Sequence, residues 1–241
     1  MNLLILDAGH AKNTAGKRNE KENFYEWEFN NDMQHKIKAR CEDLGIKEYL
    51  TNPNPSKVSD INLTTRANLA NDYWIKNNKC KAIFISLHAN AFSNSSARGT
   101  ETYVAKNASA TSKNFAKVLN DNIVKAMKEI DPTSKDRGVK SENFTVIYKA
   151  SMPSVLCEYG FYSNLDDLKI LKNNKDELVE ATVKAICSYF NIEYKEKVNE
   201  AKFDGNLYAV CVGAYKDRNK ANAIVEELKK KGYTSTYLII R

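Results

Sequence analysis

The chain has 241 residues, of which 42% are hydrophobic and 28% are charged, and its formal net charge is +7. This length is enough to bury a substantial core in one domain, with or without a small appendage. No apolar run reaches the ~18 to 20 residues of a membrane-spanning helix, so we predict no membrane span. A positive balance can favour acidic partners, but this excess is spread along the chain, and we predict no nucleic-acid partner.

Two features of the sequence indicate a chain that is made in the cytoplasm. A secretory signal would place a basic, then an apolar, then a small-residue stretch before the fold, whereas here a strand begins at Asn2 or Leu3. We therefore expect no signal peptide. Five scattered cysteines without CxxC spacing are expected to be reduced and mostly buried: Cys41, Cys80, Cys157, Cys187 and Cys211.

Three segments predict strands of a common kind: residues 2–10 (NLLILDAGH), 82–90 (AIFISLHAN) and 154–161 (SVLCEYGF). Each is a nearly continuous apolar run that ends in a titratable residue with small or polar neighbours. Continuous runs are typical of strands that are buried on both faces, as in a parallel sheet covered by helices.

Apolar residues at helical spacing predict four amphipathic helices, of which Gly45 and Pro132 stop the first and the third. Helices that alternate with strands predict an α/β fold, with a mostly parallel or mixed sheet flanked by helices. The predicted inward stripes are Phe29, Met33, Ile37, Cys41 and Leu44; Leu63, Ala67, Ala70 and Trp74; Phe115, Leu119, Ile123, Ala126 and Ile130; and Val179, Val183, Ile186 and Phe190.

The C-terminal part differs in composition from the rest. Residues 191–204 are polar and charged, and we predict a linker there between a main domain, 1–190, and a small unit, 205–241. The small unit has the pattern of one strand, a helix stopped by Gly232 and a second strand. Such a βαβ unit is small for an independent core.

Titratable residues end all three apolar strands: His10, His88 and Glu158. In open α/β sheets the functional site gathers at the carboxyl ends of the strands. We therefore expect these three side chains to lie close together.

This arrangement predicts a zinc site. A catalytic zinc ion takes three protein ligands and leaves one position for water, so His10 and His88 need a third donor. Glu26 shares the helical stripe that contains Phe29, whereas Glu28 falls on the opposite side. We predict Glu26 as the third ligand. Glu158 is the natural base for a zinc-activated water, and could return the proton to a leaving amine.

Other polar residues have simpler interpretations. A single histidine at a strand end is more often structural than a ligand, and His35 is predicted to be on the surface. Arg137 is either a loop residue or part of the site. Arg66 and Asn71 either lie on the surface of a helix or support the neighbouring strand end.

The ordered motifs LDAGH, EWEFN, LTTRANLAN, ISLHANA, GTETYV, RGVK and VLCEYGFYSN resemble the zinc-dependent N-acetylmuramoyl-L-alanine amidases of the type 3 family, over residues 2–190. The resemblance implies hydrolysis of the amide between the lactyl group of N-acetylmuramic acid and L-alanine in peptidoglycan. It also implies His10, Glu26 and His88 as zinc ligands and Glu158 as the catalytic glutamate. The chain departs from the pattern in GHAKNTAGK, where many relatives have more glycine after the histidine, and this bears on the shape of the loop.

The resemblance also suggests a biological role. With no signal peptide, the chain is similar to phage endolysins, which reach the wall through holin-made lesions, although a host enzyme released by lysis is an alternative. The segment 205–241 resembles the first half of a sporulation-related repeat (SPOR) domain, which binds peptidoglycan, and a homo-oligomer could form through it. Two other functions stay open: a zinc hydrolase acting on other peptide or acetyl amides, and a non-catalytic wall-binding protein.

Overall fold

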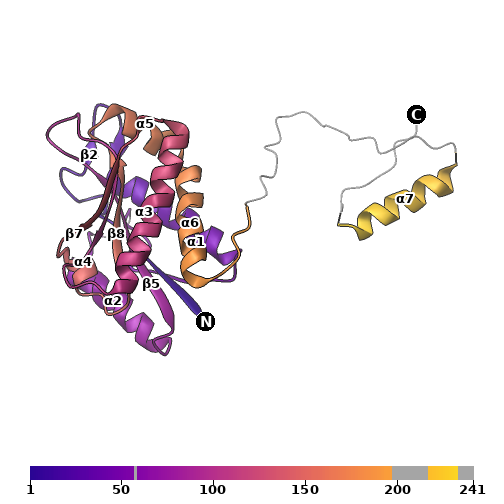
Figure 1. Cartoon of the computed structure of the whole chain (residues 1–241), viewed down its shortest axis with the longest axis horizontal. Coiled ribbons are helices and arrows are strands. Elements are labelled where there is room, and N and C mark those ends of the chain that lie inside the picture. The colour runs from indigo at the N-terminus through magenta and orange to yellow at the C-terminus, as the bar shows by residue number, and fades with distance from the viewer. Residues whose placement is uncertain (57–58, 197–216, 233–241) are drawn as a thin grey trace. The chain divides into compact units, whose positions relative to one another are not determined.

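The computed structural model describes residues 1–56, 59–196 and 217–232. The chain divides into two compact units, Met1–Lys197 and Val198–Arg241, which we describe separately (Figure 1). The described residues of the first unit form a central sheet, a small two-stranded ribbon and six helices, and those of the second form one helix.

The central sheet has six strands in the order β4-β1-β5-β8-β6-β7. Neighbours from β4 to β8 are parallel, whereas β6 runs antiparallel to β8 and parallel to β7. The predicted fold class, a mostly parallel or mixed sheet with flanking helices, is therefore confirmed. The elements of the first unit are β1 (Asn2–Ala8), β2 (Arg18–Asn19), β3 (Phe24–Tyr25), α1 (Glu26–Glu42), β4 (Lys47–Leu50), α2 (Leu63–Lys76), β5 (Lys81–Asn90), β6 (Thr100–Val104), α3 (Ala110–Ile130), β7 (Asp136–Ser141), α4 (Thr145–Tyr148), β8 (Ser154–Phe161), α5 (Leu165–Asn173) and α6 (Lys175–Phe190).

Helices on both faces of the sheet explain why its strands are continuously apolar. Helices α3 and α6 lie side by side and α1 packs against α6, while α2 and α4 form a second group (Figure 1). In β1, Leu4 and Leu6 belong to the core that α1, α3 and α6 cover, whereas Leu3 and Ile5 belong to the core beside α2 and α4. All four side chains are fully buried, so both faces of this part of the strand are covered.

The predicted helical stripes face the sheet, with one exception. The stripes of α1, α3 and α6 lie in or against the larger core. In α2, Ala67 and Ala70 are fully buried, but Leu63 is 48% exposed. Leu63 is the first residue of the helix, directly after the N-cap Asn62, and it lies beyond the packed part of the stripe.

Residues after α6 still pack against the first unit. Ile192 and Tyr194 lie against the larger core. The Tyr194 hydroxyl donates to Glu180 Oε2 over 2.6 Å, and its ring lies 5.7 Å from the Arg40 guanidinium. The described start of the predicted linker, 191–196, is thus attached to the first unit.

The second unit contributes one described helix, α7 (Arg218–Lys230), at the position that the sequence predicts. Its N-cap is Asp217, whose carboxylate accepts a hydrogen bond from the backbone N–H of Asn219 over 2.8 Å. The two strands predicted on either side of it lie outside the described residues. The division into catalytic domain, linker and βαβ unit stays a prediction.

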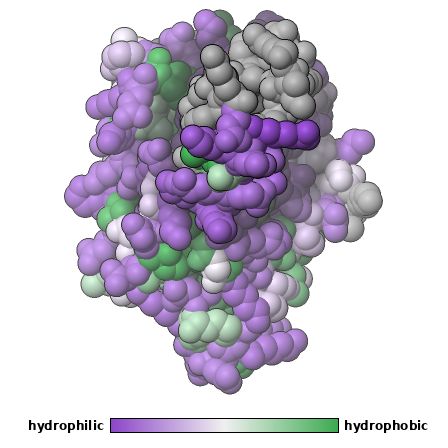
Figure 2. All heavy atoms as spheres, turned by 90° about the vertical axis from the view of Figure 1, so that its right-hand side faces the viewer, coloured by the Kyte–Doolittle hydropathy of each residue, from purple (hydrophilic) through white to green (hydrophobic). Residues whose placement is uncertain are grey.

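The described surface that Figure 2 draws is mostly hydrophilic, and the described cysteines are free and mostly buried. Figure 2 shows mostly hydrophilic residues on the face that it draws, with scattered hydrophobic ones. Among the described helices, none combines the length and the apolar character that crossing a bilayer requires. The four described cysteines are free: Cys41, Cys157 and Cys187 are buried and Cys80 is half-buried.

Candidate metal centre

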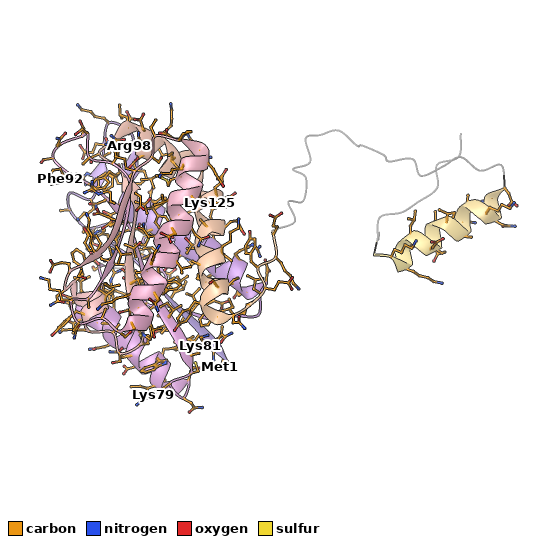
Figure 3. All side chains as sticks on the ribbon, in the orientation of Figure 1. Met1, Lys79, Lys81, Phe92, Arg98 and Lys125 are labelled. Carbon is orange, nitrogen blue, oxygen red and sulfur yellow. The ribbon has the colours of Figure 1, made fainter. Side chains whose placement is uncertain are left out.

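The predicted site residues gather at the carboxyl end of the parallel strands. Figure 3 helps to locate this end: Lys81 begins β5 at the bottom of the view, and Phe92, just after β5, lies near the top. His10 follows β1 and His88 lies close to the end of β5, while Glu26 is the first residue of α1. The backbone topology therefore brings these three side chains together at the carboxyl end of the parallel strands.

His10, Glu26 and His88 each bring one possible ligand atom to within 4.8 Å of the other two. Glu26 Oε1 lies 3.2 Å from His10 Nε2 and 3.0 Å from His88 Nδ1. Ligand atoms ~2 Å from a tetrahedral zinc ion are about 3.4 Å apart. Two imidazole nitrogens and a carboxylate oxygen with this spacing fit such an ion.

Helix α1 presents Glu26 to the site because of its position on the buried stripe. The Glu26 residue is 2% exposed, like Phe29 one turn later at 3%, whereas Glu28 is exposed. The structure places both carboxylates on the faces that helical periodicity predicts.

The two histidines keep Glu26 ionised. Burial raises the pKa of Glu26, but hydrogen bonds from His10 and His88 and their charges outweigh burial and lower the pKa to about 2. The backbone N–H of Ala89, 3.4 Å from Oε1, adds a further donor. An ionised carboxylate is the form that binds a cation.

Gly9 allows the two histidines to approach each other. The His10 and His88 rings meet edge to face with centroids 5.0 Å apart. A Cβ atom on Gly9 would lie 2.1 Å from His88 Cε1, which is far inside van der Waals contact. Only glycine fits beside the His88 ring.

A buried arginine fixes the backbone that carries His10. Arg66 is fully buried. Its Nη1 donates to Asp7 Oδ1 over 3.1 Å and to the Ala8 carbonyl over 2.5 Å. Its Nη2 donates to Asp60 Oδ1 over 2.6 Å and to the His10 carbonyl over 3.4 Å. Of the two interpretations of Arg66, support of the strand end is the one that these contacts favour.

Two buried amides complete this support. Asn52 Nδ2 donates to the carbonyls of Ala8 and His10, each over 2.9 Å. Asn30 Nδ2 donates to the Gly9 carbonyl over 3.0 Å. The loop that holds His10 is therefore tied to α1, to α2 and to the segment after β4.

Glu158 lies beside the group formed by His10, Glu26 and His88 and has one oxygen without a described hydrogen-bond partner. It is opposite His88 on the neighbouring strand. The residue is partly exposed, yet its Oε2 is buried and has no hydrogen-bond partner among the described residues. Burial raises the pKa of Glu158 well above its ordinary value, and the negative charges of Glu26 and Glu101 raise it further. This carboxyl group can hold a proton next to the site.

A comparison with known protein families matches residues 4–188 to the model described as N-acetylmuramoyl-L-alanine amidase. The matched segment contains every residue of the site, five strands of the sheet in full and β1 from Leu4 onward. The chain belongs to the N-acetylmuramoyl-L-alanine amidase family. Peptidoglycan hydrolysis at an amide bond is accordingly its activity at family level.

Similar proteins come from bacteria and from a phage. A sporulation-specific N-acetylmuramoyl-L-alanine amidase of Bacillus subtilis is 24% identical over 98% of this chain and 84% of its own length. An endolysin of Bacillus phage SPP1 is 30% identical over 80% of this chain and 68% of its own length. The solved catalytic domain of the amidase CwlV from Bacillus (Paenibacillus) polymyxa is 28% identical with a TM-score of 0.68, and the match covers 80% of this chain and 100% of that domain.

In this amidase, Gly9→Ala should weaken metal binding. The new Cβ would displace the His88 ring, and loss of ligand orientation costs about 10- to 100-fold in affinity. Competition titration with a chelator measures the change. Gly160→Ala is the matched control, because its Cβ would meet its nearest atom, Asp167 Oδ2, at 3.3 Å. Equal affinities in both variants would contradict the steric role of Gly9.

Arg66→Met should destabilise the fold. The change leaves Asp7 buried without its charged partner, and breaking a buried pair costs about 3–5 kcal/mol. Urea unfolding measures this loss. Arg18→Met removes a pair with Glu20 in which the arginine side chain is 44% exposed, and should cost about 0–1 kcal/mol. Similar losses in the two variants would show that Arg66 is not the anchor.

Sequence reasoning missed a second polar cluster near Glu158. Glu101 of β6 is 2% exposed and is opposite Glu158. It binds Asn90, Tyr103 and Arg137, the last of which the sequence left open. The sequence signal that could have identified Glu101 is a charged residue between two threonines in an otherwise strand-like segment.

The remaining residues with two interpretations have structural roles or lie on the surface. His35 is exposed, as predicted. Asn71 joins α2 to the segment after α4, since its Nδ2 donates to the Lys149 carbonyl over 2.9 Å. Its Oδ1 accepts from the Ser151 N–H over 2.7 Å.

Proposed function

We propose that this chain is a zinc-dependent amidase that cleaves the bond between the lactyl group of N-acetylmuramic acid and L-alanine. The observation that carries the proposal is the convergence of His10 Nε2, Glu26 Oε1 and His88 Nδ1 beside the partly exposed Glu158. In this proposal His10, Glu26 and His88 hold the zinc ion. When bound, zinc supplies an activated water and polarises the scissile carbonyl.

Glu158 is the proposed general base and acid. Its unpaired Oε2 takes the proton from the attacking water. The same oxygen then donates that proton to the leaving nitrogen of L-alanine. Arg66 contributes by fixing the backbone that carries His10, and Gly9 by leaving room for the His88 ring.

The proposal is tested on purified peptidoglycan. The full chain should release amino groups from it, lose this activity after treatment with a chelator and regain it with added zinc. Undiminished release after complete removal of metal would contradict the proposal.

The two alternative functions give different results in the same assay. A zinc hydrolase acting on an acetyl group would release acetate, and one acting within the stem peptide would release amino termini other than that of L-alanine. A wall-binding protein without catalysis would bind the wall and release nothing. The pairing of a metal-binding set with Glu158 favours an enzyme, because binding alone needs neither.

For the biological role we propose a phage endolysin that reaches the wall after holin action. The similarity to the phage SPP1 endolysin supports this role. The similarity to a sporulation-specific amidase supports the alternative of a host enzyme. Expression in the cytoplasm of a susceptible bacterium decides between them: an endolysin should cause lysis only when a holin is co-expressed.

For the C-terminal segment, 205–241, we propose wall binding or self-association as a SPOR-like half domain. The amphipathic pattern of α7 supports this assignment. A chain truncated after Lys197, the end of the first compact unit, should keep its metal and cleave soluble muropeptides. It should lose wall binding and any dimer seen by light scattering. Equal wall binding by both chains, with both monomeric, would contradict the proposal.

A further inference from the structure

Glu101 forms the centre of a cluster of polar side chains on β5, β6 and β7. Its Oε1 accepts hydrogen bonds from Asn90 Nδ2 over 2.7 Å and from the Tyr103 hydroxyl over 2.8 Å. Its Oε2 accepts from Arg137 Nε over 2.5 Å and from Lys140 Nζ. Two cationic side chains therefore share one carboxylate oxygen.

The cluster continues the row of residues that forms the proposed catalytic site. His88 is opposite Glu158, and Glu158 is opposite Glu101, on three adjacent strands. Side chains at paired positions project from the same face of a sheet, and neighbouring strands are about 4.8 Å apart. Strand β7 is the next strand after β6, so Arg137 lies two strands, about 10 Å, from Glu158.

Charge and exposure distinguish this cluster from a closed structural ion pair. Two cations and one carboxylate leave a charge of +1. The side chains of Arg137 and Lys140 are 34% and 36% exposed, whereas that of Glu101 is 3% exposed. One cation is enough to neutralise Glu101, so the second is surplus to that structural need.

Arg137 is also held in a defined position, and its terminal nitrogens are left as unused hydrogen-bond donors among the described residues. Its guanidinium carbon lies 4.8 Å from the centre of the Phe161 ring, and Glu101 engages its Nε. Its two terminal nitrogens have no hydrogen-bond partner among the described residues. A planar guanidinium held in this way is suited to bind a carboxylate.

We propose that Arg137 and Lys140 form a subsite for a free carboxylate of the stem peptide, and that Glu101 positions them. This inference rests on the proposed amidase function. An extended peptide spans about 3.3–3.6 Å per residue, so the ~10 Å from Glu158 corresponds to about three residues. This is a distance between strand backbones, and the Arg137 side chain reaches back to Glu101 on the intervening strand, so the carboxylate recognised is two to three residues from the scissile amide.

Two soluble muropeptides test the subsite: one with free carboxylates at these stem positions and one in which the same groups are amides. Arg137→Ala should raise KM for the free carboxylate substrate by about 10- to 100-fold, as for loss of a hydrogen bond between charged groups. KM for the amidated substrate and kcat for both should change little. Arg137→Lys should restore part of the preference, since it keeps the charge but not the planar donor pair.

Lys125→Ala is the matched control, because it removes one positive charge from a side chain that is 76% exposed on α3 (Figure 3). It should leave both KM values unchanged. Equal changes of KM for the two substrates in Arg137→Ala would overturn the inference and leave Arg137 with a structural role.

A binding measurement separates this inference from the proposed function. Each muropeptide is titrated calorimetrically into full-length Glu158→Gln protein, with and without the Arg137→Ala change. Preference for the free carboxylate that depends on Arg137 supports the subsite even if the wild-type chain cleaves neither substrate, which would refute the proposed function. If the chain cleaves or binds both muropeptides without preferring the free carboxylate, the subsite is overturned and the proposed function is not. If the chain binds neither muropeptide, the subsite is overturned as well.

Discussion

Replacing Glu158 with glutamine should lower the rate of amide hydrolysis by at least about two orders of magnitude, since general acid–base catalysis contributes ~10² to 10⁴. Glutamine keeps the shape of the side chain but cannot accept a proton from water. Glu158 lies opposite His88 without bonding to any described partner through Oε2, so its loss should leave the metal in place. Steady-state kinetics on soluble muropeptides, together with metal analysis of the same sample, measures both effects.

The rate and the metal content of Glu158→Gln together distinguish the possible roles of Glu158. Near-normal turnover would refute the catalytic role. Loss of zinc from Glu158→Gln would instead make Glu158 a ligand. Glu28→Gln, which changes an exposed carboxylate of α1 in the same way, is the control and should keep both rate and metal.

Removing the carboxylate of Glu26 should abolish zinc binding at ordinary concentrations. Glu26 Oε1 lies within 3.2 Å of nitrogens from both histidines, so Glu26→Ala removes the central donor of the set. Loss of a residue that only orients a ligand costs 10- to 100-fold in metal affinity, and we expect more than about 100-fold for the ligand itself. Activity should fall with occupancy.

Glu28→Ala is the matched control for this change, because it removes the same side chain from the exposed face of α1. Its zinc content and activity should equal those of the wild-type chain. The reverse result, with zinc lost from Glu28→Ala and kept in Glu26→Ala, would refute the assignment of ligands by helix face.

The strand ends of the site could be predicted because burial on both faces leaves a clear sequence pattern. In β8, Cys157 and Tyr159 are buried in the larger core, and Glu158 between them points to the other face, as strand alternation requires. Carboxyl ends of parallel strands meet at one edge, which is enough to bring His10 and His88 together. Helical periodicity then separates Glu26 from Glu28.

The Glu101 cluster could not be predicted in the same way. Strand β6 runs antiparallel to β8, so the start of β6 rather than its end lies at the site. A rule based on carboxyl ends overlooks Glu101 for this reason. The same rule gives no reason to choose between the two interpretations of Arg137, which lies near the start of β7, because β7 runs parallel to β6.

The role of Arg66 depends on contacts between distant parts of the chain. Its partner Asp7 precedes it by 59 residues, and the Ala8 carbonyl precedes it by 58. Helical spacing shows only that Arg66 is next to the buried Ala67. The sequence therefore left two interpretations open, and tertiary contacts were needed to choose between them.

The bond that the full, zinc-loaded chain cleaves is the most direct test of the proposed amidase activity. Purified peptidoglycan is digested, and mass spectrometry of the products identifies the new ends. We expect stem peptides with a free L-alanine amino terminus, glycan strands that keep their lactyl groups, and no new reducing sugars. New reducing ends, or peptides cleaved between later residues with L-alanine still attached to the glycan, would contradict this activity.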